Sequence, residues 1–287
     1  MIELQAGDMH LEALPDVGAA LANLTWRGKD LVRHTPSGTT NPFDTGCFPL
    51  VPFTNRIALG KFRFGGRDVH LGPNRRGDIH PLHGQGYRAP WAVTDLSQSR
   101  AVLRFVHPAG EWPWSYVAEQ TYSVEENRLH IDLSVRNTGE EAMPAGLGFH
   151  PYFPRAEDTQ FQMDFDGVWL VDETLIPTEP LPVPGRVDWR TTKRVAGEAP
   201  TDHCHYGWRS PAFITYPSEG LKLTLSASEI FRWFQIFIPE GQNFFCAEPA
   251  SHMPDPFNQP VLDDTGIKVL APGETLSGWM AIDVAKI

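Results

Sequence analysis

The chain has 287 residues, with 41% hydrophobic and 11% aromatic side chains, and a formal net charge of −11 at pH 7. This charge argues against nucleic acid or an anionic membrane as a partner, because both select for basic surfaces, and a neutral small molecule fits better. The 25 glycines and 26 prolines indicate many turns, at a level below that of disordered chains. Because large all-β folds exceed about 200 residues as one domain, we expect a single domain over residues 1–287.

The first predicted elements are strands. Residues 16–26 have the composition of a short helix, but alternate apolar side chains from Ala22 to Trp26 and the turn that follows favour a strand. Residues 61–71 predict a β-hairpin, because two consecutive glycines supply the positive φ angles of a tight turn. Residues 128–136 alternate apolar and polar side chains, which is typical of a half-buried strand.

The second half of the chain continues this pattern. Residues 177–200 are rich in proline and charge and predict a long surface loop. Residues 221–227 repeat the alternation, whereas 231–239 are apolar on both faces, as in a strand buried between layers. Because such segments recur between turns rich in Gly, Pro or Asn, the pattern predicts an all-β sandwich or barrel.

The three cysteines, Cys47, Cys204 and Cys246, are odd in number and form no C-x-x-C pair. Such usage is typical of reduced thiols in the cytoplasm. Residues 1–16 carry acidic side chains where a signal peptide needs a basic start and an apolar stretch. Since no run approaches the roughly 18 apolar residues of a membrane span, we expect a cytoplasmic protein without a membrane partner.

Polar residues stand out in five short stretches that lie in turns or at strand ends. Glu248 follows the apolar run 244–247 and precedes a proline. A carboxylate at the end of a buried strand is partly desolvated, which raises its pKa and makes it a better base near neutral pH; a glutamate that caps the strand in solvent is an equally good interpretation. His150 precedes Pro151, which favours an extended backbone, and a lone histidine in this setting is more often structural. The stretches are 48–57, 80–84, 148–153, 201–208 and 246–258.

His80 and His83 flank a proline and a leucine in a predicted loop and invite comparison with a metal site. No H-E-x-x-H motif or cysteine pair accompanies them, and a zinc site needs three or four ligands. Residues 202–205 hold two more histidines, but alternate residues of a strand point to opposite faces, which splits this group. We therefore expect no metal.

Arg56 follows an apolar stretch, and residues of this kind usually lie at the surface. Several aromatic side chains near the five stretches either form a cleft on which sugar rings stack or belong to the core. They are Phe53, Trp91, Tyr152, Phe153, Trp208 and Phe257.

Taken together, five segments resemble the aldose 1-epimerases, the galactose mutarotase-like proteins, in their order and spacing. The resemblance extends from about residue 10 to the C-terminus. It implies a large antiparallel β-supersandwich with a concave sugar-binding sheet, and an enzyme that interconverts the α and β anomers of free sugars without a cofactor. The segments are FPLVPFTNRIALGKFRFGGRDVHL, HPLHGQGYRAPW, GLGFHPYFP, DHCHYGW and CAEPASHMPDPFN.

The resemblance also implies roles for individual residues. Glu248, in the Glu-Pro motif, occupies the position of the catalytic base, and His150, in the His-x-Tyr-Phe motif, that of the catalytic acid. His83 resembles the second active-site histidine. Arg56 and Asp202 match the residues that bind sugar hydroxyls.

Two neighbouring residues are further candidates for binding the sugar. Asn55 precedes Arg56 in the same motif, and His80 shares a loop with His83. One position departs from the family pattern: Pro154 follows the His-x-Tyr-Phe motif, where galactose mutarotases have Asn. This departure leaves the preferred sugar open.

The implied chemistry needs Glu248 ionised and His150 protonated in the same molecule. Reference pKa values of about 4.3 and 6.5 favour that combination only in mildly acidic solution. A nearby carboxylate that raised the His150 pKa would extend the combination toward neutral pH, and Asp202 is the candidate for this role.

Three other functions fit less well. A hexose-6-phosphate 1-epimerase needs a basic cluster near C6 of the sugar, and the pair Arg75 and Arg76 is the only adjacent arginine pair. A sugar-binding protein without catalysis would not need both Glu248 and His150. A glycosidase needs two facing carboxylates, and the sequence offers no evident second one. We expect a small sugar as the partner, bound by a monomer or a homodimer.

Overall fold

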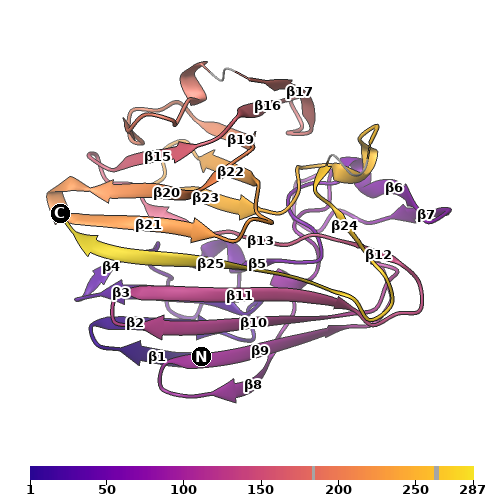
Figure 1. Ribbon diagram of the computed structural model, residues 1–287, viewed down its shortest axis with the longest axis horizontal. Helices are drawn as coiled ribbons and strands as arrows, with labels where there is room; N and C mark the ends of the chain where they lie inside the picture. The colour runs from indigo at the N-terminus through magenta and orange to yellow at the C-terminus, as the bar shows by residue number, and fades with distance from the viewer. Residues whose placement is uncertain (183–184, 262–264) are drawn as a thin grey trace.

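The computed structural model describes residues 1–182, 185–261 and 265–287. Two large antiparallel sheets pack against each other, and three smaller sheets complete the set (Figure 1). Helical structure in the described residues is confined to short 3-10 turns, and none of these helices is long and apolar enough to cross a membrane. The turns are η1 (Pro42–Asp44), η2 (Ala58–Gly60), η3 (Gly86–Arg88), η4 (Gly185–Val187), η5 (Pro217–Glu219) and η6 (Pro256–Asn258).

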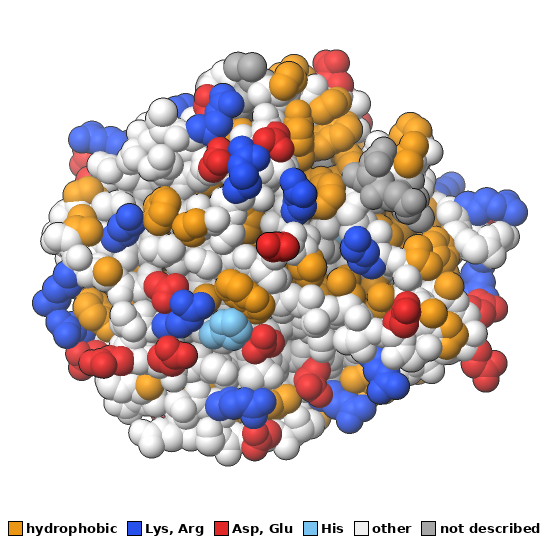
Figure 2. Space-filling model, viewed as in Figure 1, with side chains coloured by type: hydrophobic (Ala, Val, Ile, Leu, Met, Phe, Trp, Pro, Cys, Tyr) orange, Lys and Arg blue, Asp and Glu red, His pale blue; other side chains and the backbone are white. Residues whose placement is uncertain are grey.

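The larger sheet has nine strands in the order β18-β15-β20-β21-β25-β11-β10-β9-β8. In β11, next to the central strand β25, Leu129 and Ile131 are buried while Asp132 is exposed, because successive side chains point to opposite faces. Acidic and basic side chains are interspersed over the face seen in Figure 2. The strands are β8 (Ala92–Leu96), β9 (Arg100–His107), β10 (Tyr116–Glu125), β11 (Arg128–Asn137), β15 (Gln160–Asp164), β18 (Lys193–Arg194), β20 (Arg209–Tyr216), β21 (Leu221–Ala227) and β25 (Thr275–Lys286).

The second large sheet has eight strands. Seven follow the order β17-β16-β19-β22-β23-β13-β5, and β14 pairs with β23 beside β13. The strands are β5 (Pro49–Leu50), β13 (Gly148–Phe149), β14 (Tyr152–Pro154), β16 (Gly167–Val171), β17 (Pro177–Leu181), β19 (Thr201–Tyr206), β22 (Trp233–Ile238) and β23 (Phe244–Ala250).

Three smaller sheets accompany this pair, and the four-stranded one packs against β10 of the nine-stranded sheet. One has four strands in sequence order, and each of the others has two. The strands are β1 (Ile2–Ala6), β2 (Met9–Leu14), β3 (Ala20–Trp26) and β4 (Lys29–Asp30); β6 (Lys61–Phe64) and β7 (Arg67–His70); β12 (Met143–Ala145) and β24 (Lys268–Leu270).

One continuous cluster of buried apolar side chains joins the two large sheets. Phe161 of β15 meets Phe245 of β23 edge-on, with the ring centroids 5.8 Å apart, an arrangement that aromatic pairs favour. Phe245 and Ala247 both belong to this cluster. Because alternate residues of a strand point the opposite way, β23 presents its other face for a different use.

The predicted all-β fold is confirmed. Residues 128–136 and 221–227 form β11 and β21, and residues 231–239 contain β22. The strand preferred over a helix at 16–26 is β3, and 61–71 forms the β6–β7 hairpin, whose two turn glycines both have positive φ angles.

The prediction of a long loop at 177–200 is wrong in part, because this segment contains β17, η4 and β18. The proline-rich β17 forms an edge of the eight-stranded sheet. A proline is tolerated at an edge because its missing N–H breaks no bond to a further strand. Residues 183–184 of this segment lie outside the described residues.

Candidate active site

Side chains of three neighbouring strands share the face of the eight-stranded sheet that turns away from the core. Gln235 of β22 lies directly opposite Glu248 of β23, and Phe237 lies opposite Asp202 of β19. Residues i and i+2 of a strand point the same way. The period of two therefore gathers two carboxyl groups and an amide on one surface.

His150 completes this surface as the cross-strand partner of Glu248. Two residues before His150 the chain pairs with Ala250 of β23, and two residues after it with Cys246. Both pairings belong to one antiparallel register, in which His150 stands opposite Glu248. The His150 N–H donates to the carbonyl of Phe48 over 3.0 Å, which anchors the backbone at this point.

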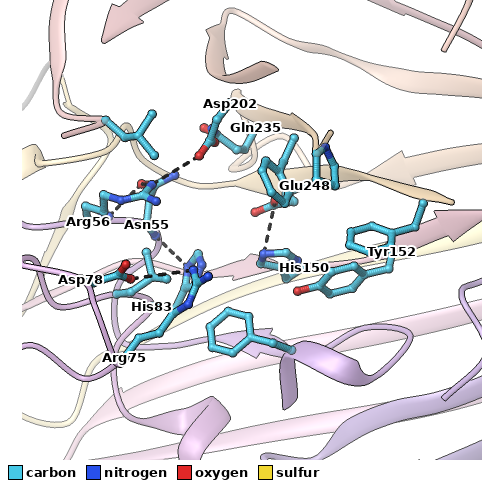
Figure 3. A pocket seen from close by; sticks show the side chains of 16 residues that line it. Asn55, Arg56, Arg75, Asp78, His83, His150, Tyr152, Asp202, Gln235 and Glu248 are labelled. Carbon is cyan, nitrogen blue, oxygen red and sulfur yellow. Dashed lines mark hydrogen bonds and ion pairs between the residues drawn. The ribbon is translucent and has the colours of Figure 1, made fainter. Parts of the chain in front are cut away.

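These side chains line a cavity of about 440 Å³ (Figure 3). Further polar groups come from Asn55, Arg56, Arg75, Asp78 and His83. The aromatic part of the lining comes from Phe43, Tyr152, Phe237 and Phe244. A hollow with a few convergent polar groups and aromatic walls is typical of a small-molecule site.

The Nε2 atom of His150 lies 3.4 Å from Oε1 of Glu248. The two side chains are only 8% and 4% exposed. The His150 ring stacks against both Phe48 and Tyr152, with centroid distances of 4.6 Å in each case. Packing on this scale fixes the direction of the imidazole.

Burial is the largest cause of the pKa shifts in this pair, because it removes water from the charged forms. It lowers the pKa of His150 to about 3 and raises the pKa of Glu248 well above its ordinary value. The charge of Asp202 raises the Glu248 pKa further, while Arg56 opposes the shift. Both shifts favour the neutral form of the pair, in which Glu248 holds the proton and His150 is uncharged.

The raised Glu248 pKa agrees with the prediction made from its position at the end of an apolar strand. The predicted effect of Asp202 on His150 is wrong, because the pKa of His150 is lowered by burial and by arginine charges. Asp202 instead lies 3.7 Å from Arg56, accepts a hydrogen bond from Gln235, and acts on Glu248.

His83 and Asn55 hold each other in place through two hydrogen bonds. The Asn55 N–H donates to Nδ1 of His83, and the His83 N–H donates to the Asn55 carbonyl, each over 3.0 Å. Because Nδ1 accepts and burial lowers the pKa of His83 well below its ordinary value, the ring is neutral with its proton on Nε2. His83 thus offers the cavity a neutral donor, 5.2 Å from the His150 ring between centroids.

Asn55 and His83 also share an unusual backbone conformation, with φ angles of 53° and 61°. Residues other than glycine rarely adopt this left-handed region, and those that do concentrate at functional sites. Arg56, next to Asn55, places Nη1 3.3 Å from Oδ1 of Asn55. Figure 3 shows this group and Tyr152 on either side of the His150–Glu248 pair.

The loop after β23 supports the segment that carries Arg56. The Asp255 N–H donates to the carbonyl of Arg56 over 2.8 Å, and its Oδ1 accepts from the N–H of Ala58 over 2.9 Å. Nε2 of His252 accepts from the N–H of Thr54 over 2.8 Å. Residues 246–258 therefore supply both Glu248 and the clamp that positions Arg56.

The structure brings six of the seven predicted site residues together around the cavity, and His80 is the exception. His80 is buried outside the lining, where its Nδ1 accepts from the N–H of Leu59 over 2.8 Å. The six are Asn55, Arg56, His83, His150, Asp202 and Glu248.

The aromatic residues noted in the sequence divide between the two predicted uses. Tyr152 lines the cavity, and Phe257 stacks on Phe62 of the β6–β7 hairpin with ring centroids 4.3 Å apart. The others, Phe53, Trp91, Phe153 and Trp208, belong to the core.

Some lining residues were not predicted. Gln235 is the only polar residue within β22. A single polar residue in an otherwise apolar strand indicates a candidate site residue from the sequence alone. Phe43, Arg75 and Asp78 lie outside the sheets, in loops and a 3-10 turn. No periodicity links them to the site, so their place there depends on the tertiary fold.

Comparison with known proteins gives a consistent result. Residues 1–283 match the sequence profile of the family described as Aldose 1-epimerase. The uncharacterised protein YphB of Escherichia coli K12 is 32% identical over 249 residues, which cover 84% of each chain. Human galactose mutarotase is 33% identical over 144 residues, which cover 46% of this chain and 41% of that protein.

Solved structures extend the comparison to the fold. A crystal structure of an Escherichia coli K12 protein assigned as an aldose 1-epimerase has a TM-score of 0.92 at 29% identity, over 99% of this chain and 98% of the other. A galactose mutarotase-like protein of Clostridium acetobutylicum has a TM-score of 0.88 at 20% identity, over 99% and 95%. From the profile match and the relatives together, the chain belongs to the aldose 1-epimerase family.

Proposed function

We propose that this protein is an aldose 1-epimerase that interconverts the α and β anomers of a free aldose. The observation that carries the proposal is the His150–Glu248 pair, whose reactive atoms lie 3.4 Å apart in the lining of a cavity of about 440 Å³. Opening a pyranose requires one group to remove a proton from the anomeric hydroxyl and another to protonate the ring oxygen. A carboxylate and an imidazole in one shielded cavity supply both.

In the proposed reaction Glu248 takes the proton of the anomeric hydroxyl while His150 gives a proton to the ring oxygen. The bond between C1 and the ring oxygen breaks, and the open-chain aldehyde forms. Rotation about C1–C2 turns the other face of the carbonyl toward the C5 hydroxyl. Ring closure then returns the C5 hydroxyl proton to His150 and the Glu248 proton to the carbonyl oxygen, so that atoms and protons balance.

The proton content of the pair suits this cycle. The neutral form, with the proton on Glu248, and the ion pair, with the proton on His150, differ only by a transfer between facing atoms. Burial favours the neutral form, which is also the form that the pair takes once the ring has opened. The preferred form of the pair therefore matches the open-chain state, in which the sugar rotates about C1–C2.

The rest of the lining suits a sugar. Arg56, Asn55 and Asp202 offer donors and acceptors to hydroxyl groups, and a charged partner strengthens such hydrogen bonds. The neutral N–H of His83 faces the same cavity. Phe43 and Tyr152 provide aromatic surface for the apolar face of the ring.

A hexose-6-phosphate 1-epimerase is the second candidate, because Arg75 lines the cavity. Its side chain is half exposed and lies 3.8 Å from Asp78, a partner that partly neutralises it. The neighbouring Arg76 is not among the lining residues. The other arginine of the lining, Arg56, also faces a carboxylate, that of Asp202. Arginines that are each paired with a carboxylate favour a neutral sugar over a phosphorylated one.

Exchange NMR on equilibrium mixtures of anomers tests the proposal. We expect the protein to accelerate exchange of at least one free aldose, with its 6-phosphate exchanging more slowly under the same conditions. Binding of free aldoses without accelerated exchange would identify a sugar-binding protein instead. Faster exchange of the 6-phosphates would favour the second candidate.

A further inference from the structure

A buried thiol lies beside the acid–base pair, and the proposed reaction does not use it. The ligand atoms of His150, Cys246 and Glu248 all lie within 4.8 Å of one another, and all three residues are buried. Cys246 stands two residues before Glu248 on β23 and therefore shares its face. It pairs across the strands with Tyr152, which lines the cavity.

We propose that His150, Cys246 and Glu248 form a binding site for a soft divalent cation of the zinc class, and that the bound ion blocks the acid–base pair. An imidazole nitrogen, a thiolate and a carboxylate oxygen are the ligands that Zn²⁺ takes in proteins, at roughly 2.0–2.3 Å in a tetrahedral arrangement. A nitrogen and an oxygen bound in this way stand roughly 3.4 Å apart. The His150–Glu248 separation is 3.4 Å, so two ligands are already spaced for the ion, and the sulfur has to close in on them from within 4.8 Å.

The charge balance also favours this ion. Zn²⁺ bound to one thiolate, one carboxylate and one neutral imidazole has no net charge, and a neutral assembly avoids the cost of an unpaired charge in a buried place. Binding releases the thiol proton and the proton held by the pair to the solvent. Mg²⁺ and Ca²⁺ require more oxygen ligands than this group offers.

The site has an entry path and a free coordination position. His150 and Glu248 line the cavity, so that an ion reaches them from the same side as a sugar. With three protein ligands, the fourth tetrahedral position is left for water or a sugar oxygen. Once bound, the ion occupies the atoms that must exchange protons with the sugar. Inhibition therefore rests on the proposed function, whereas binding does not.

Titration with Co²⁺ in metal-free buffer tests the site without reference to activity. We expect a near-ultraviolet charge-transfer band from a thiolate–Co²⁺ bond, together with the visible bands of a four-coordinate ion, and competition by Zn²⁺. Cys246→Ser should abolish the charge-transfer band and weaken Zn²⁺ binding by at least about 100-fold, because even an indirect partner of a metal ligand contributes 10–100-fold. Cys246→Ala is a second variant, and thermal unfolding checks that each variant is folded.

Cys204→Ser is the matched control. Cys204 is also a buried free thiol on the same sheet face, directly opposite Gln235, but it lies outside the three-residue group. The control should keep the band and the Zn²⁺ affinity. A wild-type protein without the band, or a Cys246 variant that retains it, would overturn the site.

The inhibitory effect has its own readout. Zn²⁺ should slow anomer exchange by the wild type and by Cys204→Ser, and chelation should restore the rate. Cys246→Ser should need at least about 100-fold more Zn²⁺ for the same fractional inhibition, with each rate compared with that of the same protein without metal. Unchanged exchange in a protein shown to hold Zn²⁺ would overturn the block. If no aldose is exchanged at all, the proposed function fails, and the Co²⁺ bands still decide the site.

Discussion

Nε2 of His150 and Oε1 of Glu248 lie 3.4 Å apart as facing residues of neighbouring strand segments, and both side chains are almost fully buried. Burial lowers the pKa of His150 and raises that of Glu248. Between the lowered pKa of His150 and the raised pKa of Glu248, the pair keeps a single proton. Its neutral form and its ion pair contain the same number of protons, so pH does not change the ratio between them.

This relationship predicts the pH dependence of kcat/KM, which reports the free enzyme. The acid limb should come from a second proton on His150, whose pKa is lowered to about 3. The alkaline limb should come from loss of the proton on Glu248, whose pKa is raised. Activity should stay level between these two limbs, as measured by exchange NMR in buffers containing a chelator. An alkaline limb with a midpoint near the reference histidine value of about 6.5 would contradict this assignment.

Replacing Asp202 with Asn should move the alkaline limb to lower pH. The negative charge of Asp202 raises the Glu248 pKa, and its removal lets Glu248 lose its proton more readily. The same change should raise KM, because Asp202 lines the cavity beside Arg56. Asp78→Asn is the control, since Asp78 lines the cavity but is not among the groups that shift Glu248. An unmoved limb in Asp202→Asn would leave Asp202 with a role in binding only.

Much of the fold follows from local pattern. Alternation of apolar and polar side chains predicted β11 and β21, and a pair of glycines predicted the β6–β7 hairpin. The strands within 177–200 escaped prediction because they lie at sheet edges, where few side chains are buried and no alternation develops.

For the site, the sequence motifs predicted which residues take part, but not how these residues are arranged. Resemblance to a family singled out His150 and Glu248, and both line the cavity. Their common register comes from pairing between segments far apart in sequence. The direction of the His150 shift was mispredicted, since it depends on how completely surrounding rings exclude water. His80 resembles His83 in sequence, yet a hydrogen bond to Leu59 holds it outside the cavity.

Removing either member of the pair should nearly abolish catalysis. Glu248→Gln and His150→Gln should each lower the exchange rate by at least about a hundredfold, the low end for a general acid or base. Both replacements keep the side chain polar, so thermal unfolding should change little. His130→Gln, on the nine-stranded sheet beside Asp132, should behave as wild type. Near-normal exchange by Glu248→Gln would disprove the mechanism.

Chelators should not lower the activity, because the proposed proton transfers require only protein side chains and sugar. EDTA dialysis followed by exchange NMR makes the measurement. If trace Zn²⁺ is bound at His150, Cys246 and Glu248, EDTA should raise the rate. A loss of activity in EDTA that a single divalent ion restores would refute this prediction and point to a catalytic metal.

The clamp around Arg56 gives a prediction that separates binding from chemistry. Asp255 is 3% exposed, and its Oδ1 accepts from Ala58 over 2.9 Å and from Nδ2 of Asn258 over 2.7 Å. Asp255→Ala leaves these donors without an acceptor and should lower the free energy of unfolding by about 1–3 kcal/mol. It should also raise KM more than it lowers kcat, because the loop carrying Arg56 loosens while His150 and Glu248 stay paired.

Asp255→Asn provides the matched comparison, since its amide oxygen can accept the same two hydrogen bonds. Stability and KM should both return toward the wild-type values in this variant, as measured by denaturant unfolding and by the dependence of the exchange rate on sugar concentration. A general loss of packing would instead change kcat and KM together, and Asp255→Asn would not restore either value. An Asp255→Ala protein with an unchanged KM would show that Arg56 is held in place without the clamp.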